Sequence, residues 1–107
     1  MFTMFQSTTR ISPQEARTLV QQKQALLLDV RTPQEYREGH VAGSVNLELD
    51  QIPAQMAKRY PNQDMHVIVI CHSGARSRSA YFMLKKMGYR HLSDLGGILS
   101  WPYDITR

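Results

Sequence analysis

The residues best suited to chemistry lie in one short loop, from Cys71 to Ser77. The loop follows a run of β-branched residues, Val67 to Ile70, which is typical of a strand covered on both faces. It precedes apolar residues at helical spacing, and Gly88 stands where that helix would take its C-terminal cap. A loop that leads into a helix directs several free N–H groups at one point, where the helix dipole adds partial positive charge. That environment favours the thiolate form of Cys71 and predicts a nucleophile.

Two arginines beside this loop indicate what the nucleophile would meet. Arg76 and Arg78 fall in the first turn of the expected helix, where acidic residues are normally preferred. They are better explained if an anion is held in front of the helix, so Arg76 is predicted to contact an anion. Its alternative role is to tie the loop to a nearby carboxylate. For a lone cysteine in an arbitrary chain, a buried strand end with solvated arginines would be the commoner interpretation, but the surrounding loop favours a nucleophile.

The pattern Cys-x-x-Gly-x-Arg-Ser between a strand and a helix resembles the active-site loop of rhodanese-family sulfurtransferases. Two further stretches resemble other signatures of that family and lie in the family's order. The first combines Leu28-Asp29-Val30-Arg31, Glu35-Tyr36 and Gly39-His40-Val41-Ala42-Gly43-Ser44-Val45-Asn46, and the second combines Leu95-Gly96-Gly97 with Trp101. Together the motifs extend from about Ser12 to Trp101, and the chain resembles a single-domain member of the family.

The resemblance implies a sulfurtransferase in which Cys71 takes a sulfur atom from a donor and carries it as a persulfide. The sulfur then passes to an acceptor thiolate or to cyanide. Loop amides and the helix end would stabilise first the thiolate and then the persulfide anion. The resemblance also implies a structural or pocket-rim role for Asp29 and hydrogen bonds from Arg31 that brace the site. His40 would be a structural hydrogen-bonding residue, and Trp101 would close the core or the pocket wall.

Each remaining loop residue has an expected role. His72 is interpreted as a substrate contact at the pocket mouth more than as an acid–base residue. Ser73 would donate a hydrogen bond to bound sulfur or substrate, or else only solvate the loop. Gly74 is expected to be needed for a positive φ or for close backbone approach. Ala75 would contribute its amide, and Ser77 is a candidate helix cap.

The sequence leaves the donor and several alternative functions open. Family members specialised for thiosulfate often carry basic residues directly after the cysteine, where this chain has His72 and Ser73, and thiosulfate is the default small anionic donor. The acceptor could be cyanide, a small thiol or a protein. A sulfur carrier that serves a partner enzyme would use the same chemistry. A phosphatase of the related fold is disfavoured because such enzymes use Cys-x5-Arg and this chain has Cys-x4-Arg. A non-enzymatic binding domain is disfavoured by the presence of Cys71.

The elements that must position this loop alternate between helix and strand. Helices are expected from a capping box at Ser12-Pro13-Gln14-Glu15 to about Gln22, from Thr32-Pro33-Gln34-Glu35 to Gly39, from Asp50 or Gln51 to about Tyr60, from Ser77 to Met87, and near Trp101 after a turn at Gly96-Gly97. Strands are expected at 25–30, 44–47, 67–70 and 91–95, and residues 1–10 would form a short edge strand or fray. This alternation predicts the α/β class, with a central, mostly parallel sheet and helices on both faces. Ligands bind outside the carboxyl ends of such strands, where Cys71 falls.

Composition narrows the remaining possibilities. The 107 residues predict one rhodanese-like domain, residues 1–107, with a core at about 12–101. The net charge of +4 comes from scattered basic residues, so no nucleic-acid partner is expected. One cysteine forms no internal disulfide, which fits a reducing cytoplasm. The four histidines show no metal-ligand spacing, and neither a metal nor another cofactor is expected. No apolar run suggests a membrane span or, in Met1 to Arg10, a signal peptide.

Overall fold

The computed structural model describes residues 7–107, in which helices and strands alternate as the sequence predicts. The helices are α1 (Pro13–Gln21), α2 (Pro33–Glu38), α3 (Ile52–Arg59) and α4 (Ala75–Met87), and the short 3-10 helices are η1 (Leu49–Gln51) and η2 (Ile98–Ser100). The strands are β1 (Leu26–Asp29), β2 (His40–Val41), β3 (Val45–Asn46), β4 (His66–Cys71), β5 (His91–Gly97) and β6 (Ile105–Thr106).

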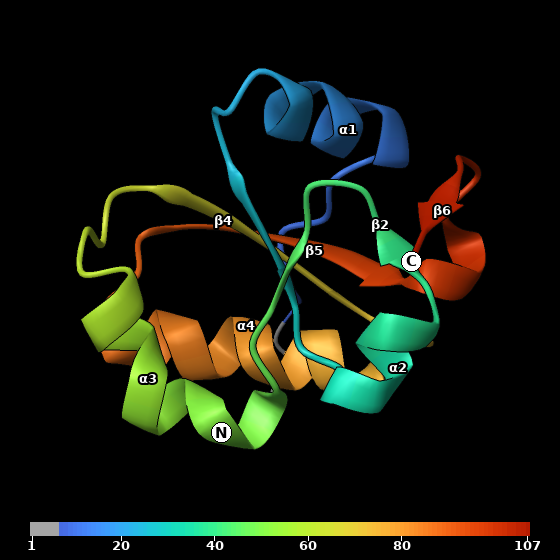
Figure 1. Ribbon diagram of the computed structural model, residues 1–107. Coiled ribbons are helices and arrows are strands. Elements are labelled where there is room, and N and C mark those ends of the chain that lie inside the picture. Colours follow the sequence, from blue (N-terminus) through green and yellow to red (C-terminus); the bar gives the residue numbers. More distant parts are fainter. Residues whose placement is uncertain (1–6) are drawn as a thin grey trace, which may run out of the picture.

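The main sheet has four parallel strands in the order β3-β1-β4-β5. Helix α1 lies on one face of this sheet, and α3 and α4 lie on the other (Figure 1). The expected α/β class, with a parallel sheet covered on both faces, is therefore confirmed. All four strands end at the same edge, which brings the segments after β1, β4 and β5 together there.

Two helix starts follow directly from the sequence. The Ser12 side chain accepts the N–H of Glu15 at 3.1 Å, which caps α1. At α2, Thr32 and Glu35 exchange both bonds of a capping box. These bonds satisfy N–H groups that have no acceptor within the first helical turn. At the other end of α4, Gly88 adopts the left-handed conformation at φ 108° and forms the expected C-terminal cap.

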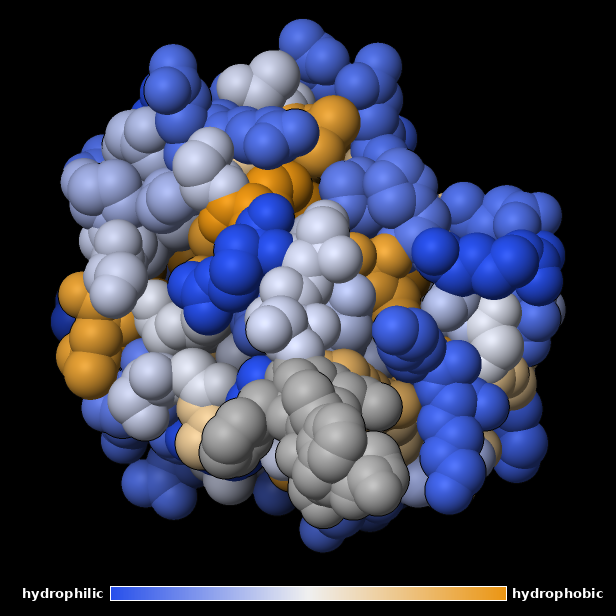
Figure 2. Space-filling view, turned by 180° about the vertical axis from the view of Figure 1, so that it is seen from behind, coloured by the Kyte–Doolittle hydropathy of each residue, from blue (hydrophilic) through white to orange (hydrophobic). Residues whose placement is uncertain are grey.

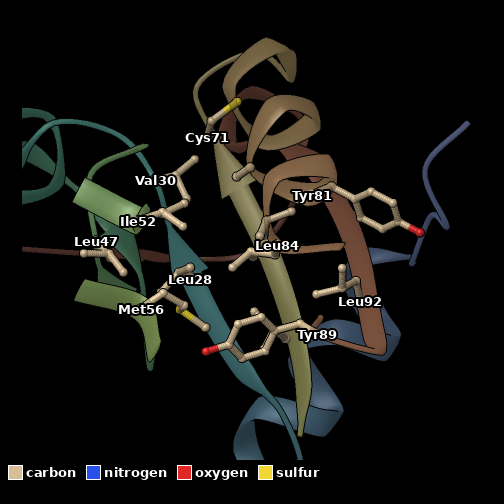
Figure 3. Close-up of a cluster of buried hydrophobic side chains, with 13 residues drawn as sticks. Leu28, Val30, Leu47, Ile52, Met56, Cys71, Tyr81, Leu84, Tyr89 and Leu92 are labelled. Atoms are coloured by element: carbon tan, nitrogen blue, oxygen red, sulfur yellow. The ribbon is translucent and has the colours of Figure 1, made fainter. Parts of the chain in front are cut away.

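The core consists of two layers separated by the sheet. The layer under α3 and α4, here called the α4-side cluster, contains Leu28, Val30, Leu47, Ile52, Met56, Val67, Val69, Cys71, Ala80, Tyr81, Leu84, Tyr89 and Leu92 (Figure 3). The layer under α1 contains Ile11, Ala16, Leu27, Val41, Ile68, Ile70 and Leu95. Alternate residues of β4 thus enter opposite layers, and this explains why the strand is apolar at successive positions.

The structure differs from the predicted boundaries in four places. Helix α4 begins at Ala75 instead of Ser77, and β5 continues through Gly96 and Gly97, where a turn was expected. Strand β3, which was expected at 44–47, is only two residues long. In addition, β2 pairs with β6 in a small antiparallel sheet that was not expected. The two-residue strands are too short to show a periodic pattern in the sequence. The extension of β5 was not expected because glycine is rare in strands.

The edge strand proposed for residues 1–10 falls partly outside the described residues, because residues 1–6 are not described. Within the described part, Arg10 forms an isolated parallel bridge with Asp94 of β5. The N–H of Asp94 also donates to the carbonyl of Thr9 at 2.7 Å. The chain therefore adds a short stretch of backbone pairing along the outer side of β5.

Within residues 7–107, no helix has both the length and the apolar character needed to span a membrane. On the face opposite to that of Figure 1, polar side chains predominate and apolar groups form small, separate patches (Figure 2). Small separate apolar patches are ordinary for a protein surface.

Candidate active site

Cys71 is the last residue of β4 and only 1% exposed. The sequence predicts a nucleophile at a polar loop and not in the core, and the structure corrects this expectation because the thiol is buried. Because Cys71 continues the alternation of β4, its side chain points to the same side as Val67 and Val69 and joins the α4-side cluster. Its Sγ accepts the N–H of Gly74 at 3.0 Å. The thiol therefore lies at the base of the loop and is held by the bend at Gly74.

Gly74 turns the chain from the strand into α4. It is the N-cap residue and has φ 116°, while a Cβ placed on it would meet no atom within 4 Å. Of the two reasons expected for this glycine, the left-handed conformation therefore applies and close approach does not. Ser77, the candidate cap, lies inside the first turn, where its hydroxyl donates to the Gly74 carbonyl at 3.1 Å. It supports the cap residue instead of being one.

The first turn of α4 lies directly behind this bend. Ala75, Arg76 and Ser77 are its first three residues, and N–H groups at these positions have no acceptor in their own helix. Together with the Gly74 N–H they place donors and the positive end of the helix dipole near Sγ. This arrangement can stabilise negative charge on sulfur.

His72 and Ser73 form the outer part of the loop, and both are exposed. His72 lines an open pocket of about 340 Å³ whose other lining residues are Arg31, Glu35, Glu38, Gly39, Ile98 and Ile105. His72 therefore lines a pocket beside the loop, and Cys71 is not among the lining residues of that pocket. A direct contact from His72 or Ser73 to a substrate stays a prediction.

Arg76 forms a two-pronged ion pair with Glu35 of α2. Its two terminal nitrogens donate to the carboxylate oxygens at 2.7 and 2.9 Å. The hydrogen bond from Arg76 is the main reason that the pKa of Glu35 falls from 4.5 to about 2, against the opposing effect of burial. The same bond raises the pKa of Arg76. The structure therefore shows the alternative role considered for Arg76, a tie to a carboxylate, and contact with an anion stays a prediction.

Asp29 and Arg31 brace the edge of the site from β1. The Arg31 side chain donates to both carboxylate oxygens of Asp29 at 2.8 to 3.1 Å, and also to the Gly39 carbonyl at 2.7 Å. Asp29 is fully buried and is not among the residues that line the pocket, whereas Arg31 does line it. The Asn46 side chain donates to the carbonyls of both residues and links β3 to this brace.

His40 packs on Tyr36, and Trp101 packs against the layer under α1. The Nδ1 of His40 donates to the Tyr36 carbonyl at 2.7 Å, and its ring stacks on that of Tyr36 at 3.7 Å. Trp101 is half-buried, packs against the layer under α1 and lines a separate cavity of about 220 Å³ beside Arg17 and Tyr103. Both residues therefore have structural contacts. Across residues 7–107, no group of three or more His, Cys, Asp or Glu side chains is placed to hold a metal ion.

The sequence interpretation missed Glu35 as a site residue. The capping box at Thr32 already explained this glutamate, and the same Pro-Gln-Glu sequence recurs after Ser12. Its second partner, Arg76, lies 41 residues further along the chain. No local pattern reports such a contact. The only available signal was that Glu35 belongs to the first family motif.

Comparison with known proteins identifies the class to which this fold and site belong. The family model of the rhodanese-like domain matches residues 12–102, and the chain is a member of that family. Thiosulfate sulfurtransferase GlpE of Tolumonas auensis is 33% identical over 106 residues, which cover 92% of this chain and 95% of that protein. Thiosulfate sulfurtransferase PspE of Escherichia coli is 35% identical over 71 residues, which cover 66% of this chain and 68% of that protein.

A solved structure agrees with this assignment. The crystal structure of a rhodanese-related protein from Thermoplasma volcanium superposes with a TM-score of 0.78 at 29% identity. The match covers 92% of this chain and 97% of the other. The recognition of a rhodanese-like domain from its motifs is therefore confirmed.

Proposed function

We propose that this protein is a thiosulfate sulfurtransferase that works through a persulfide on Cys71. The Cys71 thiolate attacks the outer sulfur of thiosulfate, a new S–S bond forms, and sulfite leaves with the electrons of the old S–S bond. The acceptor, a thiolate or cyanide, then attacks the outer sulfur of the persulfide. This second step releases a persulfide or thiocyanate and returns Cys71 as the thiolate. Atoms and charge balance without a metal, an oxidant or a reductant.

The observation that carries the proposal is the 3.0 Å contact from the Gly74 N–H to the Cys71 Sγ at the start of α4. Fixed N–H donors stabilise the thiolate, and they can stabilise the terminal sulfur of a persulfide in the same way. The exposed positions of His72 and Ser73 suit contact with the incoming donor. The names of the two relatives support thiosulfate as that donor. A reducing compartment such as the cytoplasm would keep the thiol available.

A phosphatase reaction is the main alternative, and two features of the site count against it. Only four residues separate Cys71 from Arg76, which is one fewer than in the related phosphatases. Arg76 is also engaged by Glu35, so two of its donors are not directed at the loop centre. A phosphatase would also need an acid to protonate the leaving alcohol, but Asp29 and Asp94 are only 0% and 2% exposed and are poorly placed to do so.

Intact-protein mass spectrometry tests the choice between these reactions. Incubation with thiosulfate is expected to add one sulfur atom to the protein, and later addition of cyanide is expected to remove it. In parallel, hydrolysis of para-nitrophenyl phosphate is expected not to exceed the Cys71→Ser background. Phosphate release that depends on Cys71, without sulfur uptake, would overturn the assignment. Sulfur uptake that only a partner protein can discharge would point to a sulfur carrier.

The Glu35–Arg76 pair gives a second prediction, about the loop. Glu35→Gln keeps an oxygen for the capping box but removes the charge that holds Arg76. We expect kcat/KM with thiosulfate to fall by up to about fivefold, which corresponds to the ~1 kcal/mol that a partly exposed ion pair contributes. Glu15→Gln is the matched control, because Glu15 has the same position in α1 as Glu35 has in α2. Helix α1 lies on the other face of the sheet (Figure 1). Equal effects of the two substitutions on kcat/KM would show that the Glu35–Arg76 ion pair does not contribute to activity.

The contribution of the Glu35–Arg76 ion pair to stability should also decrease at acidic pH. The pKa of Glu35 is lowered from 4.5 to about 2, so the carboxylate is favoured in the folded state. Its contribution to stability is therefore complete above about pH 4.5 and is lost as the pH falls towards 2. Acid unfolding of the wild type and Glu35→Gln should converge in that range, and a constant difference between them would contradict the assignment.

A further inference from the structure

The end of β5 forms a second wall against the loop that carries the thiol. Strands β4 and β5 pair in regular register up to Val69 opposite Asp94. Beyond that point Ile70 lies opposite Gly96, and Cys71 lies opposite Gly97. Leu95 is therefore one extra residue in β5, which makes the irregularity a β-bulge. Without the bulge, Cys71 would face Gly96 and the chain would leave β5 one residue earlier.

Local hydrogen bonding holds this bulge in place. Gly96 adopts the left-handed conformation at φ 85°, which other residues rarely adopt. Its N–H donates to Oδ1 of Asp94 at 2.9 Å, and the Asp94 side chain is buried. The other carboxylate oxygen of Asp94 lies 3.8 Å from the guanidinium of Arg10. The buried carboxylate thus stabilises the bend that carries the chain on to Gly97.

Gly97 touches the loop through backbone alone. A Cβ placed on it would lie 2.4 Å from the carbonyl oxygen of His72 and 2.6 Å from the Cα of Ser73. Both are backbone atoms, so no side-chain rotation could relieve the overlap. Its φ of −99° and ψ of 145° are ordinary for any residue, so close approach, and not conformation, requires glycine here. Just beyond it, the Leu99 N–H donates to the same His72 carbonyl at 3.3 Å.

We propose that Gly97 is a positioning residue for the sulfur-transfer loop, and that the bulge held by Asp94 puts it there. The expected effect on sulfur transfer rests on the proposed function, whereas the position of Gly97 against the loop does not. The far side of the loop is fixed by the Gly74 bend and by the pair between Arg76 and Glu35. A side chain at Gly97 would therefore push His72 and Ser73 away from β5. That displacement would move the Gly74 N–H, which donates a hydrogen bond to the Cys71 Sγ.

Gly97→Ala is the direct test, with Gly88→Ala as its matched control. Gly88 also requires glycine, at φ 108°, but it lies at the opposite end of α4 from the thiol. Both variants should melt at lower temperature. At a temperature where circular dichroism shows both folded, Gly97→Ala should lose at least about tenfold in kcat, because a displacement of the order of 1 Å at reacting groups can cost about a hundredfold. Gly88→Ala should keep the wild-type kcat.

The rate constant for alkylation of Cys71 by iodoacetamide separates this inference from the proposed function. It reports how the loop presents the thiol and needs no sulfur transfer. Gly97→Ala should change that rate constant and its pH profile, and Gly88→Ala should change neither. An unchanged alkylation profile in folded Gly97→Ala would overturn the positioning role even if the protein is a sulfurtransferase. A changed profile would support it even if the wild type takes up no sulfur.

Substitutions at Asp94 keep the inference testable if Gly97→Ala does not fold. Asp94→Asn retains a side-chain oxygen that can accept the Gly96 N–H, whereas Asp94→Ala has none, and both lose the charge that faces Arg10. Asp94→Asn is expected to keep an alkylation profile close to that of the wild type, and Asp94→Ala is expected to depart from it. Identical profiles for Asp94→Ala and the wild type would show that the bulge does not position the loop.

Discussion

Cys71→Ser is expected to reduce sulfur uptake and thiosulfate:cyanide activity to background while the protein stays folded. Serine nearly matches cysteine in size, and its oxygen can accept the Gly74 N–H that the sulfur accepts at 3.0 Å. An alcohol is far less ionised than a thiol at neutral pH, so the nucleophile is lost. Because the site is buried, some stability should be lost through the polar hydroxyl, on the order of 1 kcal/mol.

The measurements are intact mass after incubation with thiosulfate, turnover with cyanide, and thermal unfolding followed by circular dichroism. Ser79→Ala serves as a control, because Ser79 is an exposed residue of α4 and should leave all three unchanged. Residual turnover in a folded Cys71→Ser variant would eliminate the persulfide mechanism. This protein has only one cysteine, so no second thiol could account for such activity.

The largest effect on stability is expected for Asp29→Ala. The Asp29 and Arg31 side chains are 1% and 6% exposed, and their closest contact is 2.8 Å. Removal of the carboxylate leaves the guanidinium buried with no counter-charge, and breaking a buried pair in this way costs about 3–5 kcal/mol. The backbone N–H of Arg31 also loses its acceptor, Oδ1 of Asp29. The brace between β1 and the Gly39 carbonyl should weaken as a result.

Asp64→Ala provides a comparison with the same chemistry in a different environment. Asp64 pairs with Arg90 at 2.7 Å, but the two side chains are 71% and 62% exposed. Water and salt screen such a pair, so its loss should change the free energy of unfolding little. Urea unfolding of both variants tests the contrast. Similar losses for Asp29→Ala and Asp64→Ala would mean that burial does not determine the strength of the Asp29 brace.

The sequence by itself determined the local framework of the site. The β-branched run of β4, the bend at Gly74 and the helical spacing of α4 each depend on residues close together in the chain. The same holds for the capping residues Ser12 and Thr32. Periodicity, caps and positive φ are local properties, so they can be recognised without knowledge of the fold. Their alternation was enough to give the α/β class, and the motifs were enough to identify the rhodanese-like domain.

The tertiary structure alone decided how the loop is held. No local pattern shows that Glu35 pairs with Arg76, because this contact depends on how α2 and α4 are placed in the fold. Likewise, no local pattern shows that Gly97 faces Cys71, because this contact depends on which strands are neighbours. The bulge at Leu95 shifts the pairing by one residue, and no sequence pattern fixes such a shift. Burial of the thiol likewise follows from the layer of α3 and α4 packed over β4. Contacts between distant segments are set by packing of the whole chain, which is why only the folded structure reveals them.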